Sequence, residues 1–149
     1  MTKLPDALPD LLRPGLDLVI CVTSAGRRSA SDQAYYAHSR NRFWRILHEV
    51  GLTPQAPSPE EYRKLLEFDI GLTDLAKHYS GPASGLRDND YDIAGFNEKI
   101  KANQPRVLLF NGKQAAAKFF LTPTTKLEYG FQKEEIGVTA LFVAPSTSG

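Results

Sequence analysis

Short apolar runs recur along the chain at intervals that suit buried β-strands. The clearest run, "LDLVICV", is continuous rather than alternating, which is typical of a strand covered on both faces. Strands of this kind are characteristic of parallel sheets. We interpret four runs as strands: Leu16–Val22, Asp69–Leu75, Arg106–Phe110 and Ala140–Val143. The second of them is either a short strand or the exit from one.

Helical patterns lie between these runs. In Asn41–Val50 the apolar residues recur at helical spacing, and Gly51 then ends the pattern. In Ser58–Phe68 a proline stands at the first turn, where its missing N–H costs no hydrogen bond. We expect two more helices, at Asp92–Pro105 and Asn111–Phe120. We also expect a short helical turn at Leu8–Leu12 and a hairpin or edge strand at Tyr129–Pro145.

The order of these elements predicts the fold. Strands that alternate with helices favour an α/β protein with a mostly parallel sheet. We therefore expect one domain over residues 1–149, a three-layer α/β/α sandwich around a mostly parallel four-stranded central sheet. In such sheets ligands bind beyond the carboxyl ends of the strands. Four segments should converge there: "TSAGRRSASDQAYYAH", "TDLAKH", "NGK" and "PSTSG".

Composition narrows the classes of function. The 149 residues carry a formal net charge of only +1, so a nucleic-acid partner would have to be held by a local basic face. Cys21 is the single cysteine, which excludes a disulfide framework and a thiolate-held cluster. No apolar run approaches the length of a membrane span, and the N-terminal residues lack the apolar stretch of a signal peptide. We expect a cytoplasmic protein.

The long loop after the first strand holds most of the candidate chemistry. Gly26 and Ser29 could turn backbone amides toward an anion, and arginines follow Gly26 directly. Tyr35 and Tyr36 offer aromatic faces for a flat ligand. A solvated loop whose tyrosines pack on the sheet edge is the other interpretation. The three histidines lack the spacing of a zinc site and no G-x-G-x-x-G follows the first strand, so we expect no metal and no cofactor.

The stretch "YYAHSRNRFWRILHEVGLTP", Tyr35–Pro54, resembles the mismatch-specific uracil-DNA glycosylases and their thymine-DNA glycosylase relatives. Later segments resemble the same family in the same order, at Ile70–Lys77, Arg106–Ala116 and Pro145–Gly149. The resemblance implies a single-domain α/β/α sandwich that flips uracil out of double-stranded DNA, preferentially from G·U mismatches, and hydrolyses its glycosidic bond. It implies a monomer that acts on DNA and not on a membrane.

The resemblance also suggests site residues. Tyr36 falls where the family stacks an aromatic ring on the flipped base, and Thr23, Gly26 and Asn111 are assigned to the same base. Asn111 could instead cap the next helix or fix the turn before it. The residues expected to contact DNA are Arg27, Arg28, Arg40, Lys113, Ser146, Thr147 and Ser148.

The sequence departs from the family pattern in two places. An ungapped match puts Ser24 where many members have a water-positioning asparagine, and a serine is a poor base. We therefore assign the catalytic carboxylate to Asp74, with Ser24 as an auxiliary water ligand and Asp32 as the second candidate. Asp74 could instead serve only as a turn or helix cap. The helix that follows the last motif in the family has no counterpart before Gly149, and the family's wedge residue falls near Ser148.

Two other classes of function remain open on the sequence. One is a catalytically silent DNA-binding relative that keeps the fold and the pocket. The other is a hydrolase of small molecules, or a nucleotide-binding protein, on a similar sheet. Binding of a G·U duplex without excision would indicate the first, and nucleotide binding without duplex affinity would indicate the second.

Overall fold

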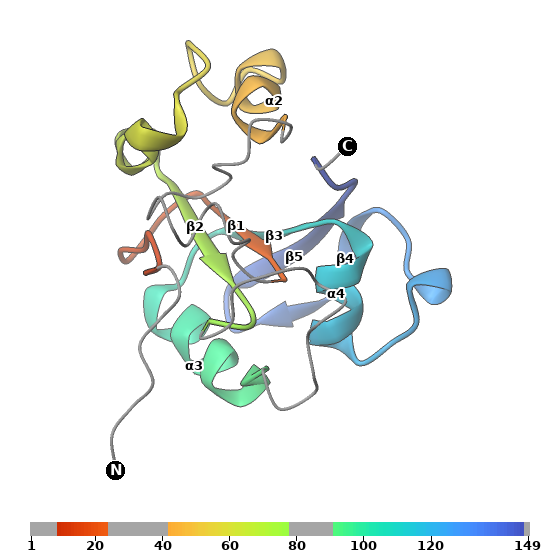
Figure 1. Cartoon of the computed structure of the whole chain (residues 1–149). Coiled ribbons are helices and arrows are strands. Elements are labelled where there is room, and N and C mark those ends of the chain that lie inside the picture. Colours follow the sequence, from red (N-terminus) through yellow and green to blue (C-terminus); the bar gives the residue numbers. More distant parts are fainter. Residues whose placement is uncertain (1–8, 24–41, 78–90, 148–149) are drawn as a thin grey trace.

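The computed structural model describes residues 9–23, 42–77 and 91–147. Its centre is a five-stranded sheet in the order β2-β1-β3-β5-β4 (Figure 1). The strands β1, β2, β3 and β5 pair in parallel, and β4 pairs antiparallel with β5. Their bounds are β1 Leu18–Val22, β2 Ile70–Asp74, β3 Val107–Asn111, β4 Gly130–Ile136 and β5 Thr139–Ala144.

Helices cover both faces of the sheet, as expected for three layers. One face packs against α2 (Phe43–Glu49) and η1 (Pro59–Phe68), a 3-10 helix whose N-terminus carries a Ser58–Glu61 capping box. The other face packs against α3 (Ile93–Asn103) and α4 (Lys113–Phe120), and Figure 1 shows the two pairs on opposite sides. A short 3-10 helix, η4 (Thr124–Lys126), follows α4.

Alternation along β1 builds the two cores. Ile20 belongs to the cluster with α2 and η1, whereas Val19 and Cys21 belong to the cluster with α3 and α4. Cys21 is fully buried, so it is a small core residue, and burial raises the pKa of its thiol well above the ordinary value. In the described ranges no helix has the length and apolar character needed to cross a bilayer.

Two expectations about the fold need correction. The sheet has five strands rather than four, because the hairpin or edge strand expected at Tyr129–Pro145 joins it as the antiparallel edge strand β4. The described part of Leu8–Leu12 forms no helical turn. Leu11 instead makes an antiparallel bridge with Leu72, with two backbone hydrogen bonds of 2.9 Å. Gly71 permits this approach, since a Cβ there would lie 2.5 Å from the carbonyl oxygen of Leu11.

Candidate active site

The carboxyl ends of the four parallel strands lie side by side at one edge of the sheet. The pairing of β1 and β2 continues past both strands, since the N–H of Ala76 donates to the carbonyl of Thr23 at 2.8 Å. In the sheet, β2 lies on one side of β1, and β3, which follows later in the chain, lies on the other side of β1. Strand order therefore reverses at Thr23, and open α/β sheets bind ligands at such a reversal.

A tight turn after β3 is joined to the segment that follows β5. The Asn111 side chain accepts a hydrogen bond from the N–H of Thr147 and donates one to its hydroxyl, both at 3.1 Å. Gly112 has a φ of +109°, and a Cβ there would lie 3.2 Å from the Cβ of Ser146. Glycine suits this position on both counts. Asn111 thus joins this turn to the segment after β5, and among the described residues no side-chain hydrogen bond caps α4.

Buried charges form a network at the end of β2. The ammonium of Lys77 lies 2.9 Å from a carboxylate oxygen of Asp74 and 2.9 Å from one of Asp10. The second oxygen of Asp10 lies 2.6 Å from Lys99 on α3, and the Thr73 hydroxyl donates to Asp10 at 2.7 Å. Asp74 is 1% exposed, and its Oδ1 has no hydrogen-bond partner among the described residues.

The network shifts its pKa values in different directions. Burial raises the pKa of Asp74 to about 6, because the attraction of Lys77 only partly offsets the loss of water. Burial also acts on Asp10, but Lys77 and Lys99 together outweigh it and hold its pKa below the ordinary value. The pKa of Lys77 is raised, because the two carboxylates outweigh its own burial. Asp74 is therefore ionised at neutral pH but close to titration.

The structure brings together the predicted site residues that it describes. Thr23, Asp74, Asn111, Ser146 and Thr147 lie at or just beyond the four strand ends. Lys113 begins α4 directly after the turn, and its ammonium lies 4.5 Å from the centre of the Tyr129 ring. The predicted residues that fall outside the described ranges are Ser24, Gly26, Arg27, Arg28, Asp32, Tyr36, Arg40 and Ser148.

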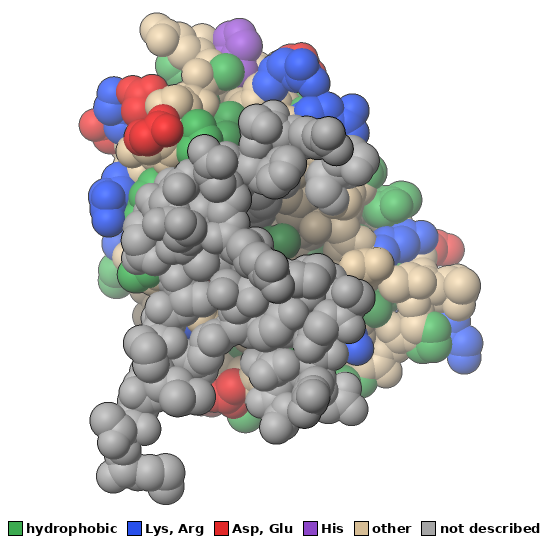
Figure 2. Space-filling view, viewed as in Figure 1, with side chains coloured by type: hydrophobic (Ala, Val, Ile, Leu, Met, Phe, Trp, Pro, Cys, Tyr) green, Lys and Arg blue, Asp and Glu red, His purple; other side chains and the backbone are tan. Residues whose placement is uncertain are grey.

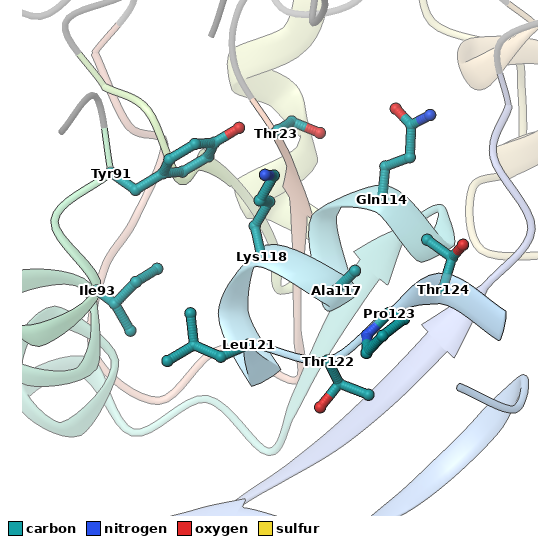
Figure 3. A pocket seen from close by; sticks show the side chains of 10 residues that line it. All are labelled: Thr23, Tyr91, Ile93, Gln114, Ala117, Lys118, Leu121, Thr122, Pro123 and Thr124. Carbon is teal, nitrogen blue, oxygen red and sulfur yellow. The ribbon is translucent and has the colours of Figure 1, made fainter. Parts of the chain in front are cut away.

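A cavity of about 870 Å³ opens beside Thr23, between α3 and α4. Lys118 extends from α4 into it, and Tyr91, just before α3, lies at one side (Figure 3). The Lys118 ammonium is 5.6 Å from the centre of the Tyr91 ring. The polar residues that line the cavity are Thr23, Tyr91, Gln114, Lys118, Thr122 and Thr124.

Sequence reasoning missed Tyr91 and Lys118 as candidate functional residues. Neither stands in a recognisable motif, and Tyr91 lies just before the helix expected at Asp92–Pro105. One signal was available: Asn111–Leu127 contains three lysines and no acidic residue. A helix and turn of that composition favour contact with an anion.

Two comparisons relate the chain to known proteins. Its fold is similar to the solution NMR structure of a candidate uracil DNA glycosylase from Methanosarcina acetivorans, with a TM-score of 0.64. That match has 23% sequence identity and covers 95% of this chain and 83% of the other, and at such identity it bears on the fold alone. The family model of the uracil DNA glycosylase superfamily matches residues 9–149. Because this match spans nearly the whole sequence, the chain belongs to the uracil DNA glycosylase superfamily.

Proposed function

We propose that the protein flips uracil out of double-stranded DNA and hydrolyses its N-glycosidic bond, with a preference for G·U mismatches. Superfamily membership supports the reaction class. The resemblance of Tyr35–Pro54 to the mismatch-specific branch supports the preference. The observation that carries the proposal is the convergence of family-like segments, because Thr23, Asp74 and Asn111 stand at the ends of neighbouring strands.

The reaction needs a group that accepts a proton. A water oxygen bonds to C1′ of the deoxyribose while the bond from C1′ to N1 of uracil breaks, and the electron pair leaves with uracil. The sugar gains positive character in the transition state, so a nearby anion stabilises it. We assign the Asp74 carboxylate to accept the proton of the water, and Ser24 to help hold that water.

Three features of Asp74 support this assignment. It ends β2 beside the exit of β1, its pKa of about 6 leaves it ionised at neutral pH, and its Oδ1 has no hydrogen-bond partner in the described ranges. Lys77 binds only the other oxygen. Because Asp74 is 1% exposed, the assignment requires that bound DNA present the sugar and its water to Oδ1.

The decisive experiment is an excision assay on labelled duplexes that carry G·U or A·U, and on single-stranded uracil DNA, followed by alkaline cleavage of abasic sites. We expect cleavage to be fastest with G·U. Equal rates on all three substrates would remove the mismatch preference. Binding of the G·U duplex with no excision would identify a catalytically silent relative, and nucleotide binding with no duplex affinity would refute a DNA substrate.

Tyr36→Ala is expected to lower uracil excision by about ten-fold or more, because base–aromatic stacking contributes roughly 1–3 kcal/mol. Tyr36→Phe keeps the ring and should have a mild effect. Single-turnover rates on the G·U duplex measure both. If Tyr36→Ala and the wild type excise uracil equally fast, Tyr36 does not lie in the base pocket.

Asn111→Asp is expected to leave the thermal unfolding midpoint nearly unchanged. The carboxylate can still accept from the N–H of Thr147, and the Thr147 hydroxyl can rotate to donate to it. Asn111→Ala should lower stability by about 1–3 kcal/mol, because that N–H loses its acceptor. Loss of excision in a stable Asn111→Asp variant would indicate contact with uracil, whereas retained activity would leave only the turn-fixing role.

A further inference from the structure

The cavity between α3 and α4 has no part in the proposed reaction, yet it adjoins the site at Thr23. We propose that it is a nucleotide subsite, which holds one nucleotide of the substrate strand with its phosphate at Lys118 and its base against Tyr91. The proposal rests on the proposed function in one respect, since it takes DNA to be the substrate.

The central observation is an exposed lysine that lines the cavity and forms no ion pair with another described residue. In the described part of the chain, no carboxylate lies within salt-bridge distance of Lys118. Its ammonium faces the Tyr91 ring at 5.6 Å, an attraction that orients it without neutralising its charge. An anion that enters the cavity can therefore bind the ammonium directly.

The surrounding segment favours an anion as well. From Asn111 to Leu127 the chain has three lysines, Lys113, Lys118 and Lys126, and no acidic residue. In Figure 2 Lys and Arg side chains are visible over α2 and near the end of α4, with acidic side chains beside them. Lysines on this side of the cavity attract phosphates even though the net charge is only +1, whereas Asp92, directly after Tyr91, adds a negative charge at the other side.

The lining fits a whole nucleotide rather than a phosphate alone. Tyr91 supplies an aromatic face for a base, while Gln114 and Thr124 supply exposed hydrogen-bonding groups at the opposite side (Figure 3). Ile93 and Ala117 add apolar surface. The volume of about 870 Å³ lies within the range of cavities that take ligands of this size.

The position of the cavity identifies which nucleotide it would hold. Thr23 lines the cavity and also ends the pairing of β1 with β2, where we place the flipped uracil. The nucleotides on either side of the flipped uracil are covalently joined to it, so they must lie close to that site. The cavity is therefore assigned to a nucleotide adjacent to the flipped one on the same strand.

The test is the affinity of the full chain for a duplex that carries 2′-fluorinated deoxyuridine opposite guanine, which resists hydrolysis. Fluorescence anisotropy at several salt concentrations gives the salt slope. Lys118→Gln should weaken binding and reduce the slope by about 0.9, the value for one lost phosphate contact. Tyr91→Ala should weaken binding about ten-fold, and Tyr91→Phe should restore most of it. Unfolding curves for all variants verify that each is folded.

Lys101→Gln is the matched control, because Lys101 is exposed in the last turn of α3 and faces Glu98 rather than the cavity. It should leave affinity and slope unchanged. An unchanged slope in Lys118→Gln overturns the subsite even if the wild type excises uracil. If the wild type excises nothing but Lys118→Gln still lowers the slope, the subsite stands and the proposed reaction fails. A wild type that binds no duplex overturns both.

Discussion

Asp74→Asn is expected to lower the rate of uracil excision by about 10²–10⁴-fold, the usual contribution of a positioned general base. Asparagine keeps the shape of the side chain and can still accept from Lys77, but Lys77 then keeps only the carboxylate of Asp10, so unfolding curves must verify that the variant is folded. Duplex affinity should change little. Single-turnover excision and anisotropy on the same G·U duplex measure the two quantities separately.

The same assignment predicts an acid limit to activity. A protonated Asp74 cannot accept a proton from water, so the rate should fall about ten-fold per pH unit below about pH 6. Protonation of Asp74 does not unfold the protein, so unfolding caused by Asp74 cannot explain a loss of excision rate in acid. Because burial raises the pKa of Asp74 in the folded state, its protonation between pH 6 and the ordinary value of 3.8 adds stability instead of removing it.

Two further variants show whether Asp74 or a neighbour is the base. Ser24→Ala should cost much less than Asp74→Asn, because a hydroxyl can position water but supplies no charge. Asp32→Asn should leave the acid limit in place. Excision by Asp74→Asn at the wild-type rate would refute the assignment, and Asp32 or Ser24 would then be the next residue to consider.

Sequence patterns predicted those parts of the fold in which the apolar side chains are buried. The continuous run in β1 and the helical stripe of α2 both reflect burial, and both were found where expected. The hairpin or edge strand expected at Tyr129–Pro145 was not counted in the central sheet, because β4 joins the sheet mainly through its backbone. Of its seven residues only Ile136 is buried, so the side chains carry little trace of the pairing with β5.

The same limit applies to the site. The fold class places Asp74 and Asn111 at the carboxyl ends of strands, which a sequence can predict. It cannot predict that Asp10 pairs with Lys99, because the two stand 89 residues apart and belong to no motif. The environment that raises the pKa of Asp74 is likewise a product of tertiary packing, and only the structure shows it.

Asp10→Asn is expected to lower the free energy of unfolding by about 3 kcal/mol at neutral pH, as for a buried ion pair that loses one partner. The substitution leaves Lys77, which is 10% exposed, with one carboxylate in place of two. Lys99 is 29% exposed and loses less, because water screens it. The N-terminal segment that bridges β2 at Leu11 should loosen with it. Urea unfolding of both proteins measures the difference.

The pH dependence of this loss separates the network from a simple packing defect. The pKa of Asp10 is lowered in the folded protein, so its stabilisation is present above the ordinary value of 3.8 and disappears as pH falls through the folded-state pKa. The gap between wild type and Asp10→Asn should therefore narrow in acid. Asp17→Asn is the matched control, since Asp17 is 61% exposed and 3.5 Å from Arg106, and it should cost less than about 1 kcal/mol. A gap that stays constant down to acid pH would mean that Asp10 stabilises the protein through its shape and not its charge.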